Sequence, residues 1–280
     1  MNILFIGDIV GRPGRDLVHK GVPALVEHYD IDLTIANAEN SAAGFGITRD
    51  IGETLLEWGV EVMTSGNHIW DKKEALDYIA TEPRLLRPAN YPAGVPGRGS
   101  YVAQTRDGRS VGVINVMGRV FMTPIDDPFA VVLREIEAIR HRVKVIFVDM
   151  HAEATSEKVS MGWYLDGKVT AVVGTHTHVQ TADERILPNG TAYLTDAGMT
   201  GPHDSIIGME REPSLARFLT GLPSKFEPAT GNPRLNGVVL EADDKTGRAT
   251  KITRISYSAQ DLLDRRFEQL DRAAPFLRPV

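Results

Sequence analysis

The chain has 280 residues, of which 42% are hydrophobic, and this length is enough for one large core or two modest ones. Its formal net charge of −6 argues against an extended surface for DNA or RNA, although metal ions can still draw a short nucleotide into a pocket. Because the chain contains no cysteine, disulfides and thiolate nucleophiles are excluded, and any metal must be held by His, Asp, Glu and Asn.

The first third of the chain predicts a parallel α/β arrangement. Its hydrophobic periodicity indicates buried strands at 2–7, 32–38 and 60–64, and helices at 14–29, 48–58 and 72–80. Because strands and helices alternate, we expect βαβ units, in which neighbouring strands run in the same direction.

Antiparallel pairing begins in the middle of the chain. Asp107-Gly108 between 101–104 and 111–116 predicts a hairpin, and Asn189-Gly190 within 186–194 predicts another. Further elements are expected as helices at 128–141 and 155–165, strands at 144–148 and 170–173, and a last hairpin of 237–242 with 249–257. The pattern predicts two mixed sheets packed face to face with helices outside.

We expect a single domain over residues 1–280. Within it, residues 198–236 are rich in Gly and Pro and are interpreted as an insertion that carries one helix at about 213–220. The amino terminus lacks the basic start and long apolar stretch of a signal peptide, and no apolar run approaches the ~20 residues that span a bilayer. We therefore expect a cytoplasmic protein with no membrane partner.

Five apolar runs end in residues that can bind a metal ion. The residues at the ends of these runs are Asp8, Glu39-Asn40, Asn67-His68, His151 and His176-Thr177-His178. Open α/β sheets bind ligands outside the carboxyl ends of their strands, so these side chains can form one site. Plainer alternatives are a surface loop for the last two histidines and a helix cap for Asn67. A carboxylate such as Glu39 beside an apolar strand is costly to desolvate without a cation.

Other polar and aromatic residues carry weaker signals. Phe45, Trp70 and Phe121 lie near the polar strand ends in sequence and could stack on a base, with core packing as the alternative. Five further candidates are expected mainly at the surface: Arg12, His19, His28, His141 and His203. The alternative for His203 is a contact with the pocket, and the alternative for Arg12 is a contact with phosphate.

The five segments that end the apolar runs resemble, in the same order, the five conserved blocks of the calcineurin-like metallophosphoesterases. The resemblance covers roughly residues 1–200. The segments read Gly-Asp-Ile-Val-Gly, Asn-Ala-Glu-Asn, Ser-Gly-Asn-His-Ile-Trp, Asp-Met-His-Ala-Glu and Gly-Thr-His-Thr-His-Val-Gln-Thr. The chain looks like the bacterial branch of that superfamily that resembles 2′,3′-cyclic-nucleotide 2′-phosphodiesterases. The resemblance implies a four-layer α/β/β/α sandwich of two mixed sheets flanked by helices.

The resemblance also implies two divalent or trivalent metal ions per chain. The first would be held by Asp8, Glu39, Asn40 and His178, and the second by Glu39, Asn67, His151 and His176. Glu39 would bridge the two ions in place of the usual Asp. The first block normally reads Asp-x-His, but here Val10 stands at the histidine position, and Asn40 is the best candidate for the missing ligand. Iron is the first expectation for the metal, with manganese or zinc as alternatives.

The implied reaction is phosphoester hydrolysis by a hydroxide shared between the two ions. His68 is not needed as a ligand, so it would act as the general acid that protonates the leaving oxygen. The alternative for His68 is that it hydrogen-bonds a carboxylate and only orients the neighbouring residues.

Three functions are therefore weighed. The leading hypothesis is a phosphodiesterase for cyclic or short nucleotides, opening 2′,3′-cyclic nucleotides to 3′-nucleotides. The others are a phosphomonoesterase, acting on a phosphoprotein or a small phosphate ester, and a non-enzymatic nucleotide-sensing protein. The expected partner is a small nucleotide and not a long nucleic acid, and a homo-oligomer is left open.

Overall fold

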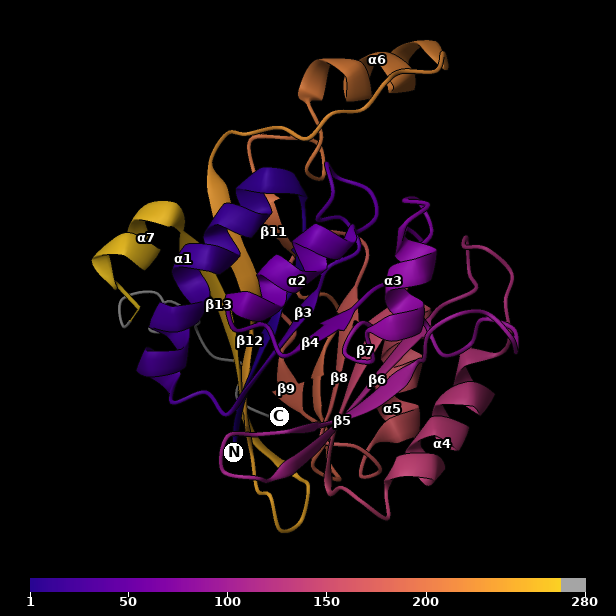
Figure 1. The fold of residues 1–280 in the computed structure, drawn as a ribbon, viewed down its shortest axis with the longest axis vertical. Coiled ribbons are helices and arrows are strands. Elements are labelled where there is room, and N and C mark those ends of the chain that lie inside the picture. Colours follow the sequence, from indigo (N-terminus) through magenta and orange to yellow (C-terminus); the bar gives the residue numbers. More distant parts are fainter. Residues whose placement is uncertain (268–280) are drawn as a thin grey trace.

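Two mixed β-sheets form the centre of the computed structural model, which describes residues 1–267 (Figure 1). The first sheet has the order β2-β11-β12-β1-β3-β4, with β13 also paired to β12. Its strands are β1 (Asn2–Ile6), β2 (Asp8–Ile9), β3 (Leu33–Asn37), β4 (Val62–Thr64), β11 (Met199–Pro202), β12 (Pro233–Ala242) and β13 (Ala249–Ser258). The β1–β3 and β3–β4 pairs are parallel, whereas β12 is antiparallel to both β1 and β13.

The second sheet has the order β5-β6-β7-β8-β10-β9. Its strands are β5 (Ser100–Gln104), β6 (Ser110–Met117), β7 (Val145–His151), β8 (Ala171–Thr175), β9 (Arg185–Ile186) and β10 (Ala192–Leu194). The four central strands β6, β7, β8 and β10 are parallel, and an antiparallel hairpin partner closes each edge. The prediction of two mixed sheets is thus confirmed.

Seven α-helices lie within residues 1–267. They are α1 (Gly11–Tyr29), α2 (Arg49–Glu57), α3 (Ala75–Thr81), α4 (Pro128–Ile139), α5 (Thr155–Leu165), α6 (Arg211–Thr220) and α7 (Ala259–Asp264). Several begin at side-chain caps, as when Thr48 accepts a hydrogen bond from the backbone N–H of Ile51 at the start of α2. None of these helices combines the length and the apolar character needed to cross a bilayer.

Successive side chains of the buried strands point to opposite faces of the sheet and pack in different hydrophobic clusters. In β1, Ile3 and Phe5 face a cluster shared by the two sheets, where the rings of Phe5 and Phe147 lie 4.8 Å apart. Leu4 and Ile6 face the opposite way, into a cluster that contains side chains of α1, α2, α3 and α7. A third cluster packs α4 and α5 against the outer face of the second sheet. Both faces of β1 are therefore buried, which explains its continuous apolar run.

The structure differs from the predicted elements mainly in and beside the Gly/Pro-rich segment. Met199–Pro202, within the predicted insertion 198–236, forms β11 and pairs with both β2 and β12. β12 also begins at Pro233, so the part outside the sheets is 203–232, and its helix begins at Arg211. A four-residue strand that ends in Gly-Pro has too little periodicity to be read from composition. Residues 268–280 of the predicted domain lie outside the described residues.

Candidate active site

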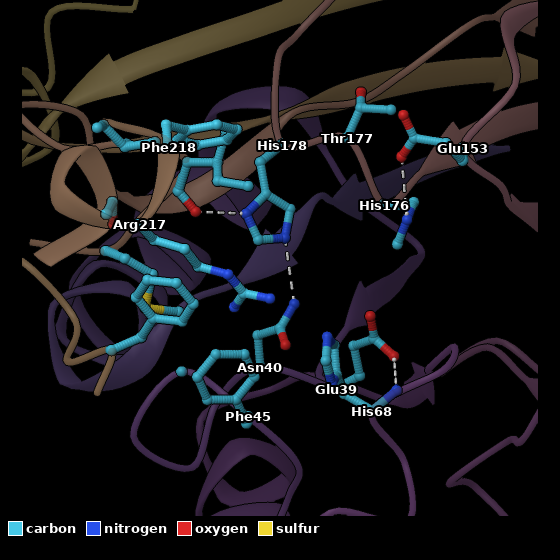
Figure 2. A pocket seen from close by; sticks show the side chains of 16 residues that line it. Glu39, Asn40, Phe45, His68, Glu153, His176, Thr177, His178, Arg217 and Phe218 are labelled. Atoms are coloured by element: carbon cyan, nitrogen blue, oxygen red, sulfur yellow. Dashed lines mark hydrogen bonds and ion pairs between the residues drawn. The ribbon is translucent and has the colours of Figure 1, made fainter. Parts of the chain in front are cut away.

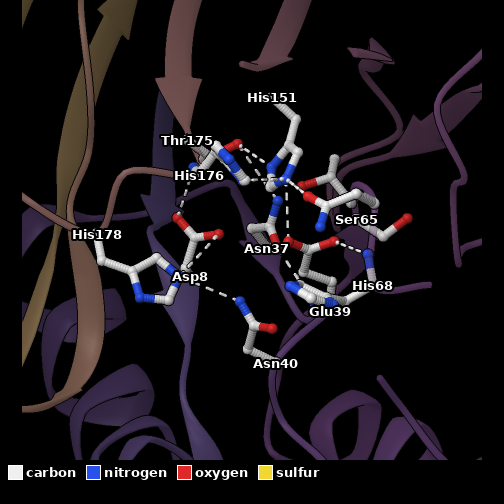
Figure 3. A network of polar contacts seen from close by, with 12 residues as sticks. Asp8, Asn37, Glu39, Asn40, Ser65, His68, His151, Thr175, His176 and His178 are labelled. Carbon is white, nitrogen blue, oxygen red and sulfur yellow. Dashed lines mark hydrogen bonds and ion pairs between the residues drawn. The ribbon is translucent and has the colours of Figure 1, made fainter. Parts of the chain in front are cut away.

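Seven side chains that the sequence singled out share one position, the carboxyl end of a strand, and Figure 3 labels six of them. In chain order they are Asp8 after β1, Glu39 and Asn40 after β3, Asn67 after β4, His151 at the end of β7, and His176 and His178 after β8. Strands β1, β3 and β4 belong to the first sheet, and β7 and β8 belong to the second. The candidate site therefore lies where the carboxyl ends of strands from both sheets meet.

Three electron-pair donors surround Nε2 of His151. Asn67 Oδ1 lies 2.9 Å from this nitrogen, Glu39 Oε1 lies 3.0 Å away, and His176 Nδ1 lies 3.1 Å away. A ring nitrogen carries at most one hydrogen, so His151 can donate to only one of these three neighbours. All four atoms would be satisfied together by one cation at their common centre.

A chain of buried hydrogen bonds fixes the other nitrogen of His151. Thr175 Oγ1 donates its only hydrogen to Asp149 Oδ1 at 2.7 Å, so it must accept from His151 Nδ1, which lies 2.9 Å away. Thr64 and Asn37 donate to the second oxygen of Asp149. Because Nδ1 carries the hydrogen, Nε2 is the atom of the neutral ring that is left to bind a metal.

A second group of donors lies beside the first. Nδ1 of His178 donates to the carbonyl of Ile207 at 2.8 Å, which leaves the Nε2 lone pair facing Asn40 Nδ2 at 3.2 Å and Asp8 Oδ1 at 4.0 Å. The other carboxylate oxygen of Asp8 accepts from the backbone N–H of His176 at 3.2 Å, which joins the two groups. Asn40 therefore lies beside His178 and in the same group of donors as Asp8.

Three buried oxygens in this region have no hydrogen-bond donor among the described residues: Asp8 Oδ1, Glu39 Oε1 and Asn40 Oδ1. Glu39 Oε1 is close to His151, but the contact is not aligned as a hydrogen bond. Leaving one buried acceptor unsatisfied costs about 1–3 kcal/mol, and more when the group is charged. All three atoms are acceptors, so positive charge is what the site lacks, and the residues present fit bound metal ions.

Burial and neighbouring charges shift the pKa values of the two imidazoles in opposite directions. Burial lowers the pKa of His151, but the charge of the adjacent Glu39 outweighs it and raises that pKa to about 9. Burial, followed by repulsion from His151, lowers the pKa of His176 to about 3. Burial raises the pKa of Glu39, yet the charge and close approach of His151 prevail and lower it to about 2. A proton thus partly fills a position that suits a cation.

The turn that carries His176 and His178 is strained and is held by a buried ion pair. The two histidines have φ angles of +97° and +66°, a region that side chains other than glycine rarely adopt. Asp196 accepts hydrogen bonds from the backbone and hydroxyl of Thr177, between them, and it also binds the buried ammonium of Lys158 at 2.6 Å. This pair keeps both imidazoles facing the other ligands.

A cavity of about 620 Å³ opens above these residues (Figure 2). His68 lines it, and Nδ1 of His68 lies 2.8 Å from a carboxylate oxygen of Asp71. The backbone N–H of His68 donates to Glu39 Oε2 at 2.9 Å. His68 is therefore oriented by a carboxylate, as its alternative interpretation required, and it also borders the cavity, as a proton donor requires.

Of the residues with weaker sequence signals, some line a cavity and others do not. Phe45 lines the cavity and meets the His68 ring edge-on with centroids 5.1 Å apart, whereas Trp70 packs against Tyr91 and the helix-side core. Phe121 is 91% exposed and does not line the cavity. His203 is half-buried and lines a neighbouring cavity. The expected surface residues Arg12, His19, His28 and His141 are exposed.

Sequence reasoning missed the residues that support the site. Asp149 and Thr175 precede recognised ligands, but each reads as part of a buried strand. Glu153, whose carboxylate lies 3.2 Å from Nε2 of His176, is two residues beyond His151 at the same strand end, and this proximity was the available signal. Asp196 and Lys158 carry no local pattern that links them to the site.

Gly66 must be a glycine, because a Cβ at that position would lie 2.0 Å from Cδ2 of the buried His151 ring. We expect Gly66→Ala to displace this ring and to lower the activity of the candidate site by about 100-fold, the scale of a 1 Å misplacement. Gly108→Ala is the control, since it adds only backbone strain in the β5–β6 turn, where nothing lies within 4 Å. Equal activity of both variants would contradict the close packing inferred here.

The fold and the site together define a mixed α/β protein with a candidate metal centre at the carboxyl ends of its strands. Residues 4–255 match the model of a protein family described as YmdB-like protein. The chain belongs to this family.

Three relatives illustrate the similarity. A Bacillus subtilis protein named 2′,3′-cyclic-nucleotide 2′-phosphodiesterase is 54% identical over 91% of this chain and 96% of its own length. The crystal structure of a hypothetical protein from Thermus thermophilus is 44% identical with a TM-score of 0.86, covering 92% of this chain and 99% of that one. The crystal structure of a novel phosphatase from Mycoplasma pneumoniae is 36% identical, also with a TM-score of 0.86, covering 92% and 93%.

Proposed function

We propose that this chain is a dinuclear metallophosphodiesterase that hydrolyses 2′,3′-cyclic nucleotides to 3′-nucleotides. The observation that carries the proposal is a group of three buried oxygens with no hydrogen-bond donor among the described residues. They belong to the seven candidate ligands, of which Glu39, Asn40, His176 and His178 line one cavity. The name of the Bacillus subtilis relative supports this substrate class. Its 54% identity extends over 91% of this chain, so the likeness includes the segments that carry the candidate site.

Two ions would be held by the two groups of donors described above. Asp8, Asn40 and His178 would bind the first, Asn67, His151 and His176 the second, and Glu39 would contribute to both. When bound, the ions supply positive charge for the phosphoryl oxygens and lower the pKa of a water molecule. Iron is proposed first, with manganese and zinc as alternatives that suit the same carboxylate, amide and imidazole ligands.

His68 would supply the proton that the leaving ribose oxygen needs. Because Nδ1 lies against the carboxylate of Asp71, Nε2 is the ring atom left to face a substrate in the cavity. A ring held in this way and bordering the cavity can pass a proton to a leaving oxygen, which is the role of a general acid.

The shape of the cavity favours a nucleotide over a phosphoprotein. One wall carries the polar ligands, and the facing wall is apolar and aromatic, with Phe45, Ile207, Met209, Phe218 and Phe226. A nucleotide has the same two halves, an anionic phosphate and a flat base that can stack on aromatic rings. Segment 206–226 supplies most of these apolar residues.

The test is metal analysis of gently purified protein combined with an assay of 2′,3′- and 3′,5′-cyclic nucleotides. We expect close to two ions per chain and 3′-nucleotide as the product of the 2′,3′-cyclic substrates, with activity lost on chelation and restored by Mn²⁺ or Fe²⁺. Bis-p-nitrophenyl phosphate should be hydrolysed in preference to p-nitrophenyl phosphate. Preference for the monoester would favour a phosphomonoesterase, and binding without turnover would favour a sensor.

Other parts of the sequence-based interpretation remain proposals. The three hydrophobic clusters, one between the sheets and one on each outer face, support a four-layer α/β/β/α order. A cytoplasmic location and a homo-oligomer are predictions that cell fractionation and light scattering would test.

A further inference from the structure

Helix α6 places a cationic side chain opposite the candidate metal ligands. Figure 1 shows α6 beyond the carboxyl ends of the strands, apart from the sheets. The cavity wall that faces the ligands comes largely from segment 206–226: Ile206, Ile207, Met209, Ser214, Arg217, Phe218 and Phe226. Arg217 is the one lysine or arginine among the described residues that line this cavity.

The guanidinium of Arg217 has no acidic partner in the described part of the chain. No carboxylate within residues 1–267 lies within ion-pair distance of it, and its side chain makes no protein hydrogen bond in that range. By contrast, the guanidinium of Arg254 on β13 is paired with Glu184. In Figure 2 the Arg217 side chain extends into the cavity that Asn40 and His178 also line. Its five N–H donors are thus available to a ligand there.

An aromatic ring holds Arg217 in this position. The guanidinium carbon lies 5.3 Å from the ring centroid of Phe226, a cation–π distance. Phe226 itself packs against the small cluster of Val10, Met199 and Met209, so it is anchored to the body of the protein. The contact with Phe226 uses none of the guanidinium N–H groups as a hydrogen-bond donor to an oxygen or nitrogen atom, so these groups stay available to a ligand.

We propose that Arg217 binds the phosphodiester group of the substrate, donating two parallel hydrogen bonds to its non-bridging oxygens from the side opposite the metal ligands. The inference rests on the proposed function, because the acidic Asp8, Glu39 and Glu153 would repel an anion from the same cavity unless metal ions are bound. Guanidinium binds phosphate oxygens in a bidentate geometry that a lysine ammonium cannot reproduce. Arg217 therefore fixes the orientation of the phosphorus atom over the ligand cluster.

The test compares Arg217→Ala and Arg217→Lys with Arg211→Ala, a control on the same helix whose exposed side chain does not line the cavity. For 2′,3′-cyclic AMP we expect kcat/KM to fall by about 10- to 100-fold in Arg217→Ala, the effect of losing a charge-assisted bidentate contact. Arg217→Lys should recover part of it, and added guanidinium should partly rescue Arg217→Ala. Arg211→Ala should match the wild type.

Binding supplies a second readout. The affinity of the metal-loaded protein for 3′-AMP, measured by titration calorimetry, should weaken about tenfold in Arg217→Ala, while its melting temperature and metal content stay unchanged. If the wild type and Arg211→Ala hydrolyse the substrate and Arg217→Ala does so equally well, the role of Arg217 is overturned and the proposed function stands. If the wild type hydrolyses no phosphodiester, both proposals fail.

Discussion

His151→Ala is expected to lose about one of two metal ions per chain and at least ~100-fold in activity, beyond the usual effect of removing a residue that only supports a ligand. The reason is geometric. Nε2 of His151 is the atom around which Asn67 Oδ1, Glu39 Oε1 and His176 Nδ1 gather within 3.1 Å. Elemental analysis after gel filtration measures the metal, and hydrolysis of 2′,3′-cyclic AMP measures the activity.

The same substitution should destabilise the metal-free protein. Glu39 and His151 are both fully buried, so removing the imidazole leaves a carboxylate without its counter-charge. Breaking a buried pair in this way costs about 3–5 kcal/mol, which urea unfolding in the presence of a chelator would detect. The control is His203→Ala, a half-buried histidine outside the cluster. Unchanged metal content in His151→Ala would refute the ligand assignment.

The sequence was sufficient to predict where the functional groups converge. β1, β3, β7 and β8 are buried on both faces, so each appears as an apolar run, and the metal-binding residue types that end or follow the run mark the carboxyl end of the strand. Glu39 and His151 were found in this way. Their contact at 3.0 Å follows from the packing of two different sheets, which no local pattern encodes.

The residues that the sequence did not reveal act through tertiary packing. Lys158 lies on α5, where its charge predicts a solvated position, yet it is buried against Asp196 and supports the turn of His176 to His178. Arg217 lies on the helix predicted at about 213–220, but nothing in the Gly/Pro-rich segment around that helix indicated which part of the molecule it faces. Its place opposite the ligands depends on how segment 203–232 folds back over the cavity, and this depends on long-range contacts such as Phe226 with Met209.

Strand β11 shows the limit of composition as a guide. Met199 and Thr200 pair in parallel with Asp8 and Ile9, so this short strand helps to fix the backbone that carries a candidate ligand. Gly201 and Pro202 made the same residues resemble a loop. Proline is tolerated there because the pairing of β11 with β2 ends at Thr200, which leaves Pro202 with a strand neighbour only in β12.

His68→Ala is expected to keep both metal ions and to lose about 10²- to 10⁴-fold in kcat on 2′,3′-cyclic AMP, the range attributed to a general acid. The contact of this residue with the candidate metal ligands is made by its backbone N–H, which donates to Glu39 Oε2 and survives the substitution. Only the imidazole is lost. His141→Ala, which removes an exposed histidine, is the control and should behave as the wild type.

The leaving group separates a proton donor from a residue that only orients the site. Ribose leaves as a strongly basic alkoxide unless it is protonated, whereas p-nitrophenolate is a much weaker base and departs without a proton. A general acid at His68 therefore predicts a large loss on the cyclic nucleotide and a small one on bis-p-nitrophenyl phosphate. Equal losses on both substrates would assign His68 a structural role through Asp71, and loss of metal would place it among the ligands.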